Sequence, residues 1–326
     1  MMARFESLMQ KAKKLPVFVY LTAVLLVLFI FGGLTIDGFF SPSTIVAILV
    51  LTAFLGIASG GQTFVIVLGA IDLSIPSMIG VANVLVGYLS GLHWPFFYIV
   101  LTILAVAIVL GTVNALASKT FDVYPLITTM ATGAIAQGGI FVLTGGRVTA
   151  SGPMWLNQAV ALNGHMGFIP LPPIIGVWAV YSIIALLLLF KTPWGKRLYA
   201  SGVSDRAAQL ALVNTTSVWI VSFIISAISA AITGVLLAGF SGSAFFSVGA
   251  PYLFTTLGAV VLGGTSLLGG RGGYGRTIFG SLLMTLITTL MIGYGFDEAL
   301  QQAFLGFVII VLLGMYGRQQ NLNMRM

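Results

Sequence analysis

Apolar runs, each about as long as a membrane-crossing helix, follow one another along almost the whole chain. Of the 326 residues, 59% are hydrophobic and only 6% are charged. A soluble domain carries about 25% charged residues, so these values exclude a soluble globular fold. A helix needs roughly 20 apolar residues to cross the hydrocarbon core of a bilayer. We therefore predict an all-α, polytopic membrane protein with a single transmembrane domain over residues 1–326.

The apolar runs divide into ten expected crossings, most of them bounded by proline, glycine or charged residues. The third is interrupted by the sequence AIDLSIPS, and the eighth is shorter than a full crossing. The expected spans are residues 17–35, 41–61, 62–90, 95–117, 124–143, 170–190, 217–239, 252–262, 277–293 and 300–316.

The basic residues predict how these spans are oriented, because loops rich in Lys and Arg stay in the cytoplasm. Alternating ten spans from a cytoplasmic start places all but one of the 14 basic residues inside, the exception being Arg147. We therefore expect both termini in the cytoplasm. The net charge of +7 forms no dense basic stripe, so it indicates topology and not nucleic acid binding.

The sequence offers little for metal or cofactor chemistry. It has no cysteine, and its two histidines, His93 and His165, are isolated, so we expect no metal site and no cofactor. The glycine-rich stretch GGTSLLGGRGGYGR, residues 263–276, lacks the G-x-x-x-x-G-K-[ST] pattern of a phosphate-binding loop. Its glycines instead predict tight turns and close backbone packing. No catalytic constellation is present, so an enzyme is not expected.

Three stretches carry a family resemblance: GGQTFVIVLGAIDLSIPS (60–77), GKRLYASGVSDRAAQLALV (195–213) and AVVLGGTSLLGGRGGYGRTIFGSLL (259–283). In order and spacing they resemble the permease subunits of ribose-type ABC importers. The resemblance implies a multi-pass subunit of a bacterial inner membrane that passes a small polar solute, most often a sugar. It also implies three kinds of partner: cytoplasmic ATP-binding subunits, a periplasmic solute-binding protein, and a second permease copy or paralogue. ATP hydrolysis would then belong to another chain. The alternative is an ion-coupled secondary transporter.

Asp72 is the only acidic residue inside a predicted span. A charge at the bilayer centre costs roughly 2.5–3.5 kcal/mol on insertion scales. Pro76 lacks the N–H that would bond the Asp72 carbonyl, so we expect the helix to break here, with Ser74 capping the half that follows. Two interpretations stay open: the carboxylate caps that half-helix at its positive dipole end, or it lines the solute path.

Three amides, those of Asn83, Asn114 and Gln137, also fall in apolar spans. Polar side chains in such positions usually hydrogen-bond a neighbouring helix, which is the interpretation we favour. Some of them could instead touch the solute, since sugars need hydrogen-bonding partners.

Two charged segments are expected on the cytoplasmic side. In KRLYASGVSDRAAQL, helix-forming residues follow Ser204, which could cap them, and GGTSLLGGRGGYGR follows the short eighth span. The resemblance implies that such segments seat in the ATP-binding subunits, and the alternative is that they are solvated loops. The candidate coupling residues are Arg197, Asp205, Arg206, Arg271 and Arg276.

Two weaker patterns complete the sequence evidence. Residues 144–169 form a polar loop in which WLNQAVAL predicts a short interfacial helix; the loop either covers the surface or docks the solute-binding protein. Residues 65–73, VIVLGAIDL, share four of nine positions with residues 259–267, AVVLGGTSL. If this similarity is not chance, it predicts an inverted repeat, because the third and eighth spans run in opposite directions in the ten-span topology.

Overall fold

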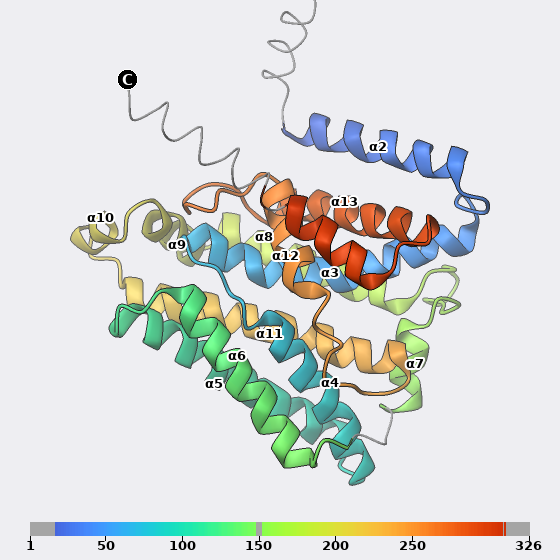
Figure 1. Cartoon of the computed structure of the whole chain (residues 1–326). Helices are drawn as coiled ribbons and strands as arrows, with labels where there is room; N and C mark the ends of the chain where they lie inside the picture. The colour runs from blue at the N-terminus through green and yellow to red at the C-terminus, as the bar shows by residue number, and fades with distance from the viewer. Residues whose placement is uncertain (1–16, 148–151, 309, 311–326) are drawn as a thin grey trace, which may run out of the picture.

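The computed structural model describes residues 17–147, 152–308 and 310, and in these ranges the chain is built of α-helices (Figure 1). The helices are α2 (Val17–Thr35), α3 (Pro42–Leu68), α4 (Ile75–Gly91), α5 (Phe96–Thr120), α6 (Pro125–Thr144), α7 (Met154–Val160), α8 (Pro173–Lys191), α9 (Pro193–Val203), α10 (Asp205–Leu210), α11 (Thr215–Ser241), α12 (Tyr252–Leu262) and α13 (Tyr274–Gly293). The basic N-terminal segment, Arg318 and Arg325 lie outside the described residues, so the position of the termini stays a prediction.

The helices confirm a polytopic, all-α membrane protein. Seven of them are long and apolar enough to cross a membrane: α2, α3, α5, α6, α8, α11 and α13. Two shorter apolar helices, α4 and α12, fall in the expected third and eighth spans. Residues 298–308 are also helical, within the region of the expected tenth span.

Helices α3 and α11 form the centre of the bundle, and α11 packs most closely against α3, α4 and α5. Small residues allow the backbones to approach, as is common between membrane helices. A β-carbon on Gly61 would lie 2.8 Å from Ser226 Cα, and one on Gly111 would lie 2.7 Å from Ile224 Cα. The two central helices are therefore fixed by backbone contact, and they hold the segments between helices in place.

One predicted boundary is wrong, because the second span does not end at Gly60 and Gly61. Helix α3 continues without interruption to Leu68. The two glycines face neighbouring helices: a β-carbon on Gly60 would lie 2.4 Å from Tyr181 Oη, and one on Gly61 would meet α11. They provide space for packing, and the helix ends instead at Gly69, which takes a left-handed φ of 91°.

The two similar segments, residues 65–73 and 259–267, each contain the end of a helix. Residues 65–68 finish α3 and residues 259–262 finish α12, so the first segment does not begin the third span as predicted. The loop that follows α12 returns to the end of α3, where Gly270 N donates to Val67 O at 2.8 Å. Both helices therefore end at the same side of the bundle, and the predicted opposite orientation of the two segments is wrong.

Candidate functional site

Two non-helical segments interrupt the bundle, the first mostly buried or half-buried and the second mostly exposed. Residues 69–74 join α3 to α4, and residues 242–251 join α11 to α12 beside α4 (Figure 1). The second segment follows α4 closely: Phe245 N donates to Asn83 Oδ1 at 2.9 Å, and a β-carbon on Gly249 would lie 1.9 Å from Pro76 O. Irregular backbone at membrane depth is tolerated only where protein buries it or where it lines a cavity. These two segments are therefore the first place to look for a site.

Asp72 lies in the first segment, and its side chain is buried. Its Oδ1 accepts from Ser74 N at 2.8 Å and from Ser74 Oγ at 2.5 Å, while its Oδ2 accepts from Ser226 Oγ of α11 at 2.7 Å. Three donors thus satisfy the carboxylate, and the break expected at Pro76 is present because α4 begins at Ile75. Asp72 joins the broken segment to α11.

The predicted cap by Ser74 is wrong. Its hydroxyl makes no capping bond to α4; it donates to Asp72 and accepts from Asn114 Nδ2 at 2.9 Å. Asn114 Oδ1 in turn accepts from Thr132 Oγ1. A hydrogen-bonded chain therefore runs from α11 through the broken segment to α5 and α6. Ser74 cannot cap because Asp72 and Asn114 hold its hydroxyl away from the helix end.

The other predicted amides differ in exposure. Asn83 is buried, and its Nδ2 donates to Gly234 O at 3.3 Å, so it links α4, α11 and the second segment. Gln137 is exposed, and its Nε2 makes one long bond of 3.4 Å to Phe246 O. Of the three predicted amides in the described residues, Gln137 is the one whose side-chain oxygen accepts no hydrogen bond.

A cavity of about 400 Å³ lies where the two non-helical segments meet α6. Gln137, Gln302, Ser77 and Ser247 supply amide and hydroxyl groups to its wall. The remaining lining residues are apolar: Leu73, Pro76, Met130, Ala134, Phe246, Ala250, Leu253 and Phe254. The cavity thus offers neutral hydrogen-bonding groups beside two phenyl rings, which is the mixture expected of a small-molecule site.

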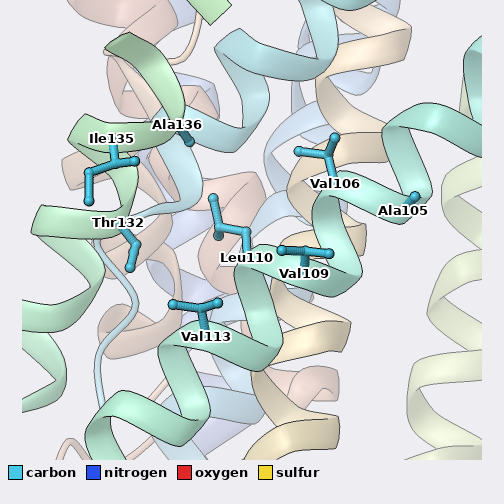
Figure 2. A pocket seen from close by; sticks show the side chains of 8 residues that line it. All are labelled: Ala105, Val106, Val109, Leu110, Val113, Thr132, Ile135 and Ala136. Atoms are coloured by element: carbon cyan, nitrogen blue, oxygen red, sulfur yellow. The ribbon is translucent and has the colours of Figure 1, made fainter. Parts of the chain in front are cut away.

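A second hollow of similar size, about 390 Å³, lies between α5 and α6 (Figure 2). It is lined by Ala105, Val106, Val109, Leu110, Val113, Thr132, Ile135 and Ala136. The single hydroxyl in its wall, that of Thr132, already donates to Asn114. We call it the α5/α6 groove. It offers no free polar group, so it suits a lipid chain or an apolar helix and not a polar solute.

Four of the five predicted coupling residues are arginines. Arg197 on α9, Arg206 on α10 and Arg271 in the 263–273 loop are exposed, and Arg276 in the first turn of α13 is half-buried. As predicted, Ser204 caps α10, accepting from Ala207 N at 3.2 Å. The three exposed arginines are free to meet a partner.

Asp205 differs from the arginines because it is already engaged. It forms an ion pair with Lys119 at the end of α5 and accepts from Gln209 Nε2 at 2.8 Å. It therefore fastens α10 to α5.

Exposed leucines beside these arginines escaped prediction. Leu210 is 82% exposed and Leu212 is 95% exposed, although both lie in the charged part of the chain between α9 and α11. Leu212 also takes a left-handed φ of 61°, which is unfavourable for a leucine. The two leucines therefore leave apolar surface exposed next to the charged residues of this segment.

The 144–169 loop contains the predicted short helix, α7. Asn157 Nδ2 donates to Gly239 O of α11 at 2.7 Å, and the Trp155 ring packs edge-on against Phe96 with centroids 4.8 Å apart. Gln158, Asn163 and His165 line an open polar depression next to them. Residues 152–169 are therefore fixed on the bundle by these contacts, and they present a polar surface.

Within the described residues, no group of three His, Asp or Glu side chains could hold a metal ion.

The comparisons with known proteins are consistent with a transport subunit. The ribose import permease protein RbsC of Bacillus subtilis is 32% identical over 88% of this chain and 88% of its own length. The fructose import permease protein FrcC of Rhizobium meliloti is 27% identical over 95% and 88%, respectively.

The ribose import permease protein RbsC of Haemophilus influenzae is 28% identical over 78% of each chain. No solved structure matches this chain significantly. The model of a family described as the permease component of branched-chain amino acid transport systems matches residues 44–313. This match covers most of the chain, including both non-helical segments, the residues that line the cavity, and helices α9 and α10. The chain therefore belongs to this family of transport permeases.

Proposed function

We propose that the chain is the membrane permease subunit of an ATP-driven, binding-protein-dependent importer, and that its solute is a sugar or a similar polyhydroxylated molecule. The observation that carries the choice of solute is the cavity at the two non-helical segments. Its wall holds neutral amides and hydroxyls beside Phe246 and Phe254. Such groups can hydrogen-bond hydroxyls while the rings pack against the apolar face of a sugar ring.

The family description names branched-chain amino acids, which are zwitterions at neutral pH. A desolvated ammonium or carboxylate group needs an opposite charge or several strong hydrogen bonds. None of the residues lining the cavity is charged, and Asp72 is already bonded to three donors. The neutral wall favours an uncharged solute, in keeping with the ribose and fructose permeases among the relatives.

Within this function, the predicted residues take different roles. Gln137 contacts the solute, since its side chain is exposed at the cavity. Asp72, Asn83 and Asn114 hold the two non-helical segments in place through their buried hydrogen bonds. We assign Asp72 the anchoring role and not direct solute binding, because the cavity wall does not include it.

The partners follow from the same function. ATP hydrolysis takes place on separate cytoplasmic ATP-binding subunits, a periplasmic binding protein delivers the solute at the side of α7, and a second permease copy or paralogue completes the path.

The chain lies in a bacterial inner membrane with both termini in the cytoplasm. Single cysteines at Asp205 or Gly272 should then react only from the cytoplasm, and one at Gly152 only from the periplasm. Periplasmic labelling at either of the first two would contradict the orientation.

The cytoplasmic contact uses Arg206, Arg271 and the exposed Leu212. We expect Arg206→Glu or Arg271→Glu to leave the permease inserted but to weaken its binding to the ATP-binding subunits about tenfold. Reversing a charge at an interface is unfavourable, and a tenfold loss of affinity corresponds to about 1.4 kcal/mol of binding free energy. The measurement is co-purification and solute-stimulated ATPase activity in proteoliposomes with the cognate subunits. Arg147→Glu, on the opposite side, is the matched control. Unchanged coupling in both variants, or uptake by the chain alone, would overturn the proposal.

A further inference from the structure

Three segments far apart in the sequence meet backbone to backbone at the cytoplasmic end of α3. They meet at four glycines, which we call the glycine junction: Gly69, Gly202, Gly269 and Gly270. A β-carbon on Gly202 would lie 2.0 Å from Val67 O and 2.7 Å from Gly270 N. A β-carbon on Gly269 would lie 2.6 Å from Gly202 O and 2.8 Å from Gly69 N. No side chain can enter this contact.

Hydrogen bonds fasten the same three segments to one another. Gly270 N donates to Val67 O at 2.8 Å, which joins the 263–273 loop to α3. Tyr199 Oη donates to Gly272 O at 2.9 Å, which joins α9 to the loop. Burial raises the pKa of the Tyr199 phenol, and the nearby Arg276 lowers it by less, so the hydroxyl stays protonated and can donate.

The glycine junction includes Gly69, the first residue of segment 69–74. Gly69 ends α3, Asp72 follows three residues later, and Leu73 lines the cavity. On its other side, Gly202 belongs to α9, whose Arg197 is exposed, and α10 with Arg206 follows at once. Contacts between long side chains can absorb a displacement by changing rotamer, but a contact between backbones passes it on.

From this geometry we propose that the glycine junction transmits movement of α9 to segment 69–74, and that Gly202 is a positioning residue for transport. The inference rests on the proposed function, since ATP-binding subunits must supply the movement. When they close and shift α9, the backbone of Gly202 displaces Val67 and Gly69, and Leu73 moves at the cavity. Coupling then travels through a physical contact with two arrangements.

The test uses a reporter at the cavity. Because the chain has no cysteine, Leu73→Cys introduces a single thiol, whose labelling rate is measured in the complex with ATP-binding subunits, with and without a non-hydrolysable ATP analogue. We expect Gly202→Ala to retain subunit binding but to reduce both the nucleotide-dependent change in labelling and the uptake by about tenfold. Gly275→Ala is the matched control, because its β-carbon meets only Leu186 Cδ2, at 3.5 Å.

A milder variant covers the case in which Gly202→Ala fails to accumulate. Tyr199→Phe removes only the bond to Gly272 O and keeps the stacked contact with Phe190, so we expect about a threefold loss of the labelling response. A normal change in labelling on addition of nucleotide, in both Gly202→Ala and Tyr199→Phe, would overturn the proposed role of the glycine junction. A parent chain that binds the subunits but shows no response would do the same. If no ATP-binding subunit binds the parent chain, the proposed function fails as well.

Discussion

The α5/α6 groove and the cavity at the two non-helical segments have almost the same volume, about 390 Å³ and about 400 Å³, respectively. Helix α6 contributes to the wall of both. They differ in the backbone that surrounds them. Regular helices alone form the groove (Figure 2), whereas the cavity also has residues of two non-helical segments in its wall. Only the cavity contains polar side chains with free hydrogen-bonding capacity.

This difference shows where a membrane protein can place polar recognition. A regular helix satisfies the hydrogen bonds of its own backbone. Where such a helix faces lipid, its side chains have to be apolar. A broken segment needs buried partners such as Asp72 and Asn83, and the same irregular backbone borders the cavity. An interruption of the helical pattern therefore marks the site more clearly than a local loss of apolar residues does.

The sharpest test of this comparison places the same bulky side chain in each hollow. Ala134 lines the cavity and its neighbour Ile135 lines the groove, both on α6. We expect Ala134→Trp to reduce uptake at least about a hundredfold, which corresponds to about 2.8 kcal/mol, because the indole fills the cavity. Ile135→Trp, on an exposed position, should leave uptake near normal. Equal loss in both, at equal membrane abundance, would break the distinction.

A smaller but still large effect is expected at Asp72. Asp72→Ala leaves the Ser74 and Ser226 donors buried without an acceptor, at about 1–3 kcal/mol each, so the abundance of folded permease should fall severely. Asp72→Asn keeps an oxygen that accepts from Ser74 N, and it should retain most transport. Detergent-extracted protein is quantified by size-exclusion chromatography, and uptake is normalised to it. Abolished transport by Asp72→Asn at normal abundance would instead place Asp72 on the solute path.

The smallest effects should separate two polar side chains of α6. Gln137→Leu removes a neutral contact in the cavity and should raise the apparent KM for solute about threefold without changing abundance. Thr132→Val removes the donor to Asn114 in the groove wall, and it should lower thermal stability by about 1 kcal/mol without changing KM. The two variants are compared by uptake kinetics and by thermal melting in detergent. The reverse pattern would mean that the groove, and not the cavity, receives solute.

Sequence alone predicted those features that depend on local chemistry. The helical membrane fold follows from the apolar runs, the break from Pro76, and the start of α10 from Ser204, whose hydroxyl caps it. The end of α3 was misplaced because Gly60 and Gly61 look like terminators, although they serve packing against other helices. A glycine does not reveal which of these uses it has until its neighbours in space are known.

The site itself depends on contacts that cross the chain. The 242–251 segment, GSAFFSVGAP, is rich in small residues and ends in proline, which was a usable signal for an irregular segment. Its position beside α4 comes from Asn83 and Gly249, which no local pattern predicts. The exposure of Leu210 and Leu212 was equally hidden, because an exposed leucine and a buried one look alike in sequence.

Helix α2 packs mainly against α13 and buries little of its own surface in the bundle (Figure 1). During synthesis, α2 leaves the ribosome long before its packing partner, which begins only at Tyr274. At about 5–20 residues per second, α2 must wait on the order of tens of seconds for the surface on which it rests. For that time the face of α2 that later meets α13 is open to lipid, and its sequence, which carries no charged residue, is suited to the delay.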